Sequence, residues 1–357
     1  MLQEQIERHK RFWAGEGPSL ILIPAPGESR PTDGLTPAMS TFSMDPEALY
    51  ERETARARTV LGWPTDGIPT VRPNFGVVFI PAIAGQPYLL QEGQMPWPGE
   101  PLTREAILAA RSVDVGNADL MCRAEKFYAL HHASGAPEIA AYHPDTQGVF
   151  DIAHMLWGEQ LFYDVIDPSQ RAWVDELLDV CLDLYLRVSQ HVKALMDEPD
   201  GSMIHGHGTA QGVYFPHAGV RTSEDTAILF SPDSLEEVIA PFIERSVSPF
   251  GGAFAHFCGR CPFLFERLCR STAIRAIDTQ PGMHDPAWML ERCAASGTAL
   301  YSRIDGLPGE TWEAYVRRIG GLVRATGARC ILRATVHPAE RSECEDMLAL
   351  WRELTTP

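Results

Sequence analysis

The run GAFAHF at Gly252–Phe257 is followed by IRAID at Ile274–Asp278, ALYSRI at Ala299–Ile304 and CILRATV at Cys330–Val336. Each run is short and mostly apolar, which is typical of a buried strand. The segments between the runs are long enough to hold a helix, and they carry helical patterns. A repeated alternation of strand and helix predicts parallel strands that are connected by helical crossovers.

Four further strand-like runs precede this stretch. They are SLILIP at Ser19–Pro24, GVVFIPA at Gly76–Ala82, EIAAY at Glu138–Tyr142 and SMIHG at Ser202–Gly206. Eight strand–helix units in one chain of 357 residues favour a closed (β/α)₈ TIM barrel over an open doubly wound sheet. The phosphate-binding patterns GxGxxG and GxxxxGK[ST] are absent, which also argues against the open alternatives. We predict one α/β domain over residues 1–357, with an N-terminal helical extension over residues 1–18.

Three helices can be delimited by their ends. The first is expected from Gln170 to Met196, with apolar residues at helical spacing along one face. The second is expected from Gly309 to Thr326, with a glycine directly after it as the C-cap. The third is expected to have Ser234 as its N-cap, with Glu237 completing a capping box.

The composition excludes several classes of function. With 30 Lys and Arg against 47 Asp and Glu, the formal net charge is −17, which disfavours binding to nucleic acid or to anionic lipid. Hydrophobic residues make up 45% of the chain and charged residues 22%, so a full core can form. The eight cysteines do not form a disulfide framework in a chain of this length, and neither a signal sequence nor a membrane-spanning run is apparent. We therefore expect a reduced, cytoplasmic protein.

In a TIM barrel the chemistry lies at the carboxyl ends of the strands. The polar residues that follow the predicted strands are therefore the candidates for a site. They are His205, His207, His256, Cys258, Asp278, Gln280, Arg303, Asp305 and His337.

The pair His256 and Cys258 suggests a metal. Two residues that are two apart at a strand end project to the same side, and an imidazole with a thiolate suits zinc. A third ligand is needed, and His337 directly follows the last predicted strand, so we predict the set His256, Cys258 and His337. Without this context an H-x-C pair is weak evidence, and Cys258 with Cys261 also forms a single C-x-x-C, which is a poor match to a redox motif or a zinc knuckle. We leave out Cys330, because it opens a strand at the opposite end of the barrel.

Four segments resemble the uroporphyrinogen decarboxylase superfamily, which includes zinc-dependent, corrinoid-linked methyltransferases. The segments are NFGVVFIPAIAG at Asn74–Gly85, DTQGVFDIAHMLWG at Asp145–Gly158, TSEDTAILFSPDSLEEVIAPF at Thr222–Phe242 and AHFCGR at Ala255–Arg260. The resemblance extends from Arg11 onward and implies a (β/α)₈ barrel.

Departures from the decarboxylase pattern decide between the branches. The arginine-rich motif that grips substrate carboxylates in the decarboxylase is represented here only by Arg30, and Gly76 stands where the decarboxylase has an essential aspartate. These losses argue against porphyrinogen decarboxylation. The H-x-C motif, in contrast, matches the metal motif of the methyltransferase branch, which usually has a cysteine after the last strand where this chain offers His337.

The resemblance implies a zinc-dependent enzyme that moves a methyl group between a small corrinoid protein and a thiol or similar acceptor. Asp225 is the implied catalytic helper, although it could be an ordinary carboxylate at a helix start. His207 is a second candidate, and its alternative is a structural histidine. Two other functions stay open. One is a metal-free decarboxylase-like enzyme that acts on another acid with His337 and Asp225, and the other is a non-catalytic protein that binds a tetrapyrrole or corrinoid.

Overall fold

In the computed structural model, which describes residues 2–28, 44–90 and 95–357, six parallel strands form the main sheet. Their order across the sheet is β1–β12–β11–β10–β9–β8. The bounds are β1 (Leu20–Leu22), β8 (Val220–Ser223), β9 (Ala253–Phe257), β10 (Ile274–Thr279), β11 (Ala299–Ile304) and β12 (Cys330–Ala334). The four apolar runs from Gly252 onward are therefore adjacent parallel strands, as predicted.

A second, four-stranded sheet has the order β5–β2–β7–β6. Its strands are β2 (Ile68–Val71), β5 (Ala140–Ala141), β6 (Met203–His205) and β7 (Gln211–Phe215). β2 and β5 are parallel, whereas β7 is antiparallel to both β2 and β6. A small separate hairpin pairs β3 (Tyr88–Leu89) with β4 (Trp97–Pro98).

The two sheets are joined by isolated hydrogen bonds. On one side the backbone N–H of Asp66 donates to the carbonyl of Ile21 at 3.0 Å, and on the other the N–H of Gly148 donates to the carbonyl of Ser223 at 2.8 Å. Among the described residues these junctions contain no strand ladder, so a closed eight-stranded barrel is not shown. The α/β class and the parallel central sheet are confirmed.

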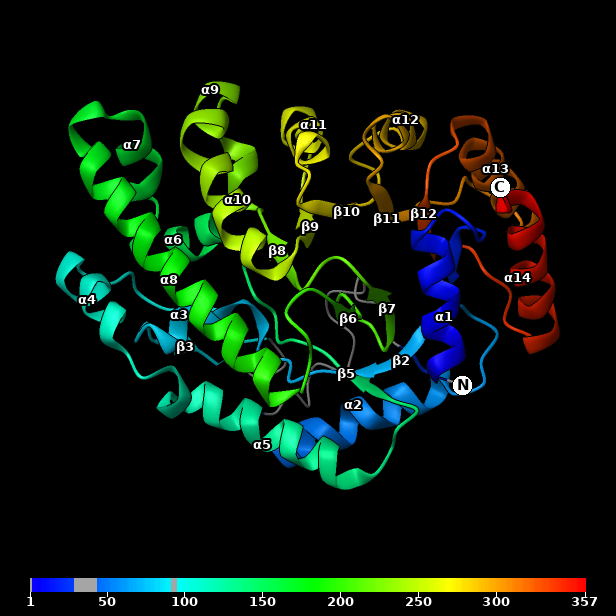
Figure 1. Cartoon of the computed structure of the whole chain (residues 1–357), viewed down its shortest axis with the longest axis horizontal. Helices are drawn as coiled ribbons and strands as arrows, with labels where there is room; N and C mark the ends of the chain where they lie inside the picture. Colours follow the sequence, from blue (N-terminus) through cyan, green and yellow to red (C-terminus); the bar gives the residue numbers. More distant parts are fainter. Residues whose placement is uncertain (1, 29–43, 91–94) are drawn as a thin grey trace.

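Helices surround the strands (Figure 1). Their bounds are α1 (Leu2–Trp13), α2 (Pro46–Val60), α3 (Phe79–Ile83), α4 (Arg104–Ala109), α5 (Asp119–Ser134), α6 (Val149–Trp157), α7 (Gln160–Ile166), α8 (Arg171–Leu195), α9 (Pro232–Ser234), α10 (Ala240–Val247), α11 (Pro262–Arg270), α12 (Pro286–Ser296), α13 (Trp312–Thr326) and α14 (Arg341–Thr355). The predicted long helix is confirmed as α8. The predicted second helix is α13, and Gly327 is its left-handed C-cap with φ of 67°.

Three predictions about local structure are wrong. The run Gly76–Ala82 is a short 3₁₀ turn followed by α3, because a buried helix and a buried strand have the same apolar signal over so few residues. The run around β6 belongs to a hairpin with β7 and is not part of the parallel sheet. The N-cap of α9 is Ser231, whose side chain accepts a hydrogen bond from the N–H of Ser234, the residue predicted for that role.

The interior of the strand layer is filled mainly by large apolar side chains. Phe12 of α1 packs in this cluster with Leu22, Phe254, Tyr301 and Ile331 from the main sheet. Phe12 thereby attaches α1, which lies within the predicted extension over residues 1–18, to this core. Arg30 lies outside the described residues.

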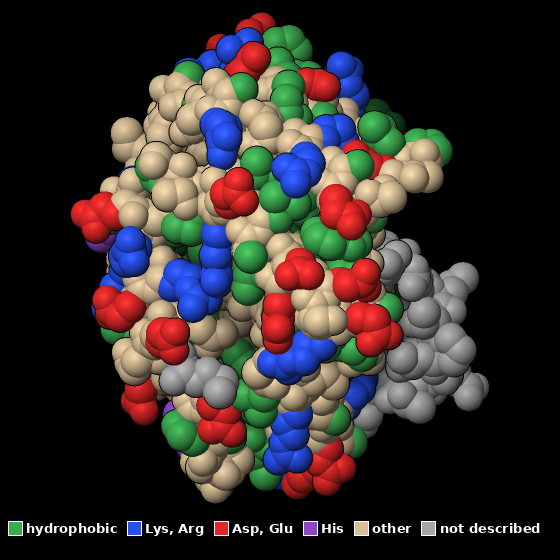
Figure 2. Space-filling model, turned by 90° about the vertical axis from the view of Figure 1, so that its right-hand side faces the viewer, with side chains coloured by type: hydrophobic (Ala, Val, Ile, Leu, Met, Phe, Trp, Pro, Cys, Tyr) green, Lys and Arg blue, Asp and Glu red, His purple; other side chains and the backbone are tan. Residues whose placement is uncertain are grey.

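The surface carries both signs of charge. Figure 2 shows basic and acidic side chains interspersed over the face on the side of α14, where Arg341 pairs with Glu345 at 3.1 Å. Charges of opposite sign thus offset one another on this face. Within the described ranges, no helix has both the length and the apolar character that a membrane span requires.

Candidate metal centre

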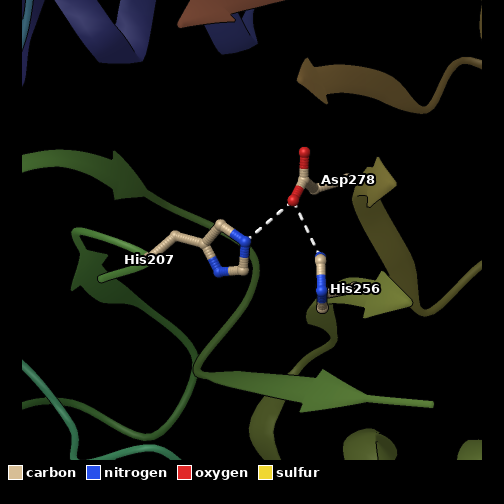
Figure 3. Close-up of side chains that lie close together, drawn as sticks. All are labelled: His207, His256 and Asp278. Carbon is tan, nitrogen blue, oxygen red and sulfur yellow. Dashed lines mark hydrogen bonds and ion pairs between the residues drawn. The ribbon is translucent and has the colours of Figure 1, made fainter. Parts of the chain in front are cut away.

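The centre is built on the adjacent strands β9 and β10. His256 and Asp278 are paired across these strands and lie level with one another. One carboxylate oxygen of Asp278, Oδ2, accepts a hydrogen bond from Nδ1 of His256 at 2.8 Å and another from Nε2 of His207 at 2.8 Å (Figure 3). Asp278 is fully buried, so both imidazole rings are held from inside the protein.

The hydrogen bond to Asp278 decides which nitrogen of His256 is available. Since Nδ1 carries the proton that is donated to Asp278, Nε2 presents its lone pair. That Nε2 lies 3.3 Å from Sγ of Cys258 and 3.8 Å from Oδ1 of Asp225. The potential ligand atoms of Asp225, His256 and Cys258 all lie within 4.8 Å of one another.

Asp225 reaches this group from the neighbouring strand. It follows β8, which pairs with β9, and its Oδ1 accepts a hydrogen bond from the backbone N–H of Cys258 at 2.5 Å. The carboxylate of Asp151 accepts hydrogen bonds from the backbone N–H groups of Asp225 and Thr226 at 3.0 and 2.7 Å, which anchors the loop after β8. Hydrogen bonds therefore hold both the backbone of Asp225 and its carboxylate in position.

The ionisable side chains in and around the candidate metal centre shift one another's pKa values. Burial, with the nearby Asp225, raises the pKa of Asp151 to about 7. Burial by itself would raise the pKa of Asp278, but the charge and hydrogen bond of His207, followed by those of His256, lower it well below its usual value. Burial lowers the pKa of His207 well below its usual value, while the charge and hydrogen bond of Asp278 act in the opposite direction. The candidate ligands thus sit beside a carboxylate that stays ionised.

The donor set fits a zinc ion. Sulfur, imidazole nitrogen and carboxylate oxygen are the ligands that zinc takes in proteins, and three protein ligands leave one position for a substrate. A carboxylate that holds the far nitrogen of a ligating histidine is a common support for such sites. Burial and the neighbouring Asp225 raise the pKa of Cys258 to about 12, and a cation at this position would oppose that effect.

The predicted third ligand His337 is not brought into this group. Within the part of the chain that the structure describes, neither cluster of potential ligands includes it, and its Nδ1 lies 3.0 Å from the carbonyl oxygen of the adjacent Pro338. The physical reason is the order of the strands, because β10 and β11 separate β12 from β9. The third potential ligand in the group is Asp225, which follows β8 on the other side of β9.

His207 lies in the centre but in the other cluster, with His256 and Asp278. It has an unusual positive φ of 44°, and its backbone N–H donates to Nδ1 of His205 at 3.0 Å. A non-glycine residue in this conformation is strained, and such strain is often found at functional sites.

Sequence reasoning placed Asp278 and Gln280 after a strand but did not assign them a role. In the structure, Gln280 Oε1 accepts a hydrogen bond from the N–H of Gly259 at 2.9 Å and so supports the loop that carries Cys258. The available signal was their position at the end of the predicted strand that follows His256, since Asp278 lies in β10 and Gln280 directly follows it. Cys261, the other cysteine of the C-x-x-C pair, is buried at the start of α11, which begins at Pro262.

Comparison with known proteins finds a similar structure but no similar sequence. No protein-family profile matches the chain, and no curated protein matches it in sequence. Among solved structures, the chain is similar to a methyltransferase from Methanosarcina mazei, with 98% of each chain covered, a TM-score of 0.67 and 12% sequence identity. At this level of identity the similarity establishes a shared fold.

Proposed function

We propose that the chain is a zinc-dependent methyltransferase that transfers a methyl group between a small corrinoid protein and a thiol acceptor. The observation that carries the proposal is the convergence of Asp225, His256 and Cys258, with His256 held in the required tautomer by Asp278. The shared fold with a methyltransferase supports the same activity. We further propose that the two sheets form a (β/α)₈ barrel of the uroporphyrinogen decarboxylase type, within its methyltransferase branch.

Asp225, His256 and Cys258 would hold the zinc ion, in place of the set that includes His337. When bound, zinc would lower the pKa of an acceptor thiol so that the thiolate is present at neutral pH. Asp278 keeps His256 oriented, and Gln280 keeps the backbone of the Cys258 loop in position. The corrinoid of the partner protein would supply the methyl group, and the thiolate would be the nucleophile that accepts it.

Metal analysis tests the ligand set. We expect about one zinc per chain in the native protein, by elemental analysis after purification without chelator. Asp225→Ala and Cys258→Ser should weaken zinc binding by more than the roughly 10–100-fold that loss of a supporting hydrogen bond costs. His337→Ala is the matched control and should retain zinc. Retention of zinc by Asp225→Ala together with its loss from His337→Ala would restore the ligand set expected from the sequence.

Chelation tests the reaction. With free methylcobalamin and 2-mercaptoethanol as probes, removal of the metal should abolish formation of the methyl thioether, and added zinc should restore it. Activity that survives complete removal of the metal would contradict the proposal and favour a metal-free enzyme. Corrinoid binding without turnover of any thiol would instead favour a non-catalytic binding protein.

A further inference from the structure

A cavity of about 280 Å³ lies at the amino ends of the parallel strands. Two arginines line it: Arg275 is the second residue of β10, and Arg329 directly precedes β12. His256 and Asp278 lie instead towards the carboxyl ends of β9 and β10. Because these strands are parallel, the cavity and the candidate metal centre are at opposite ends of the sheet. The volume is close to the lower limit of about 300 Å³ for small-molecule sites.

The cavity carries positive charge. Arg275, Arg329 and His217 line it, and none of the described residues around it is acidic. Within residues 2–28, 44–90 and 95–357, the two guanidiniums donate to backbone carbonyls and not to carboxylates. Burial, followed by the charge of Arg275, lowers the pKa of Arg329, so the two cations repel one another. In a chain with a formal net charge of −17, such a pair favours an anionic ligand.

The backbone holds both guanidiniums in position. Nε of Arg275 donates to the carbonyl of His217 at 3.1 Å, and Nη1 of Arg329 donates to the carbonyl of Trp13 at 2.8 Å. Nη2 of Arg329 also donates to the carbonyl of Gly297. These bonds fix the planes of the side chains but do not neutralise their charge. Since a guanidinium has five N–H donors, each arginine keeps donors for a ligand.

The other walls of the cavity combine a hydroxyl with aromatic surface. Oγ of Ser271 accepts a hydrogen bond from the N–H of Ala273 at 3.2 Å, and its own proton has no acceptor among the described residues. Trp13 and Phe215, whose ring centres are 5.2 Å apart, form an apolar side. The indole N–H of Trp13 donates to the carbonyl of Tyr214 at 2.7 Å, which fixes this ring. A ligand that matches both walls has an oxyanion at one end and an apolar group at the other.

We propose that this cavity binds a small phosphate ester, with its phosphate between Arg275 and Arg329 and its organic group against Trp13. A phosphate monoester has a charge of about −1.5 to −2 at neutral pH, which matches two guanidiniums, whereas a monocarboxylate offsets only one of them. Its oxygens can accept from both arginines and from the hydroxyl of Ser271. The site lies away from the metal centre, so its occupancy is independent of zinc and of methyl transfer.

Calorimetric titration of the full chain with phenyl phosphate tests the site, both with zinc and with chelator present. Inorganic phosphate and phenol, the two parts of the probe, are the reference ligands. We expect phenyl phosphate to bind more tightly than either, with the same affinity in both conditions. Arg275→Gln and Arg329→Gln should each weaken binding by about tenfold or more, because each removes charge-assisted hydrogen bonds. Arg317→Gln, which removes an exposed charge from α13, is the matched control and should bind like the wild type.

Chemical modification tests the same site in the unaltered chain. Phenylglyoxal modifies accessible arginines, and peptide mass spectrometry locates them. Phenyl phosphate should slow the modification of Arg275 and Arg329 and leave that of Arg317 unchanged. This protection supports the site even if Arg329→Gln does not fold, which matters because Arg329 holds the end of α1. The site is ruled out if neither arginine is protected, or if Arg275→Gln binds phenyl phosphate as tightly as the wild type.

Discussion

At the scale of single residues, Asp278 organises the centre. It is buried, it accepts a hydrogen bond from each of two imidazoles, and it thereby leaves Nε2 of His256 free for a ligand. The same residue provides negative charge beside the proposed zinc ion without contributing to the ligand set. Its influence on the centre is thus exerted through His256.

We predict that Asp278→Asn weakens zinc binding by roughly 10–100-fold, because an amide cannot accept from both rings with the same strength. The measurement is a zinc competition titration against a chromophoric chelator. Asp305→Asn, an equal change of charge at an exposed position, is the control and should leave the zinc affinity unchanged. Equal affinities for wild type and Asp278→Asn would show that His256 does not need this support.

Replacement of Arg333 is expected to make the protein more stable. Arg333 is only 7% exposed, and among residues 2–28, 44–90 and 95–357 its guanidinium forms no ion pair. Arg333→Met should therefore raise the free energy of unfolding by about 1–2 kcal/mol, as replacements of strained functional groups often do. Urea denaturation of the metal-free protein measures this change. A loss of stability would show that the Arg333 side chain stabilises the fold.

At the scale of elements, α1 is attached to the strand layer through His9. Nε2 of His9 donates to the carbonyl of Asp66 at 2.8 Å, and Nδ1 accepts from the N–H of Tyr214 at 3.0 Å. These two bonds require the neutral ring, and burial lowers the pKa of His9 from its ordinary value of 6.5 to about 4. One side chain thus connects α1 to the segment before β2 and to β7.

This arrangement predicts a pH dependence of stability. Between pH 6.5 and about 4 the unfolded chain binds a proton at His9 that the folded chain does not, so the free energy of unfolding should fall as the pH falls through this range. The loss attributable to His9 is about 3 kcal/mol in total. His9→Gln keeps a donor and an acceptor but does not titrate, so its unfolding free energy, measured by urea denaturation across this range, should fall less steeply. Identical slopes for the two proteins would contradict the assignment.

At the scale of the whole molecule, the junction between the two sheets depends on close backbone approach at Gly148. A Cβ atom at this position would lie 2.4 Å from the carbonyl oxygen of Ser223 and 2.3 Å from Oε1 of Glu224. Only glycine allows the hydrogen bond between Gly148 and Ser223 to form without displacing β8. This contact also lies two residues from Asp225.

We predict that Gly148→Ala destabilises the protein by about 2–3 kcal/mol, because the clash involves backbone that must move. Thermal unfolding monitored by circular dichroism measures the effect. Gly321→Ala in α13, where no atom lies within 4 Å of the added Cβ, should instead be neutral or slightly stabilising. Tolerance of Gly148→Ala would mean that the junction is looser than the structure shows.

Local patterns in the sequence were sufficient for the α/β class, for the strands β9 to β12 and for α8 and α13. These elements bury long apolar faces at a regular period, and α13 ends at a glycine whose conformation is a local property. The pairing of His256 with Cys258 was also accessible, because a spacing of two on a strand determines the side on which both residues lie.

The tertiary structure decided the rest. The third potential metal ligand, Asp225, follows β8, a strand of only four residues that apolar patterning does not detect. The order of strands across the sheet sets His337 apart from β9. The surroundings of Arg333 were equally inaccessible, because the sequence shows its charge but not which side chains face it. Local periodicity is a property of neighbouring residues, whereas a ligand set or an uncompensated charge depends on which strands become neighbours.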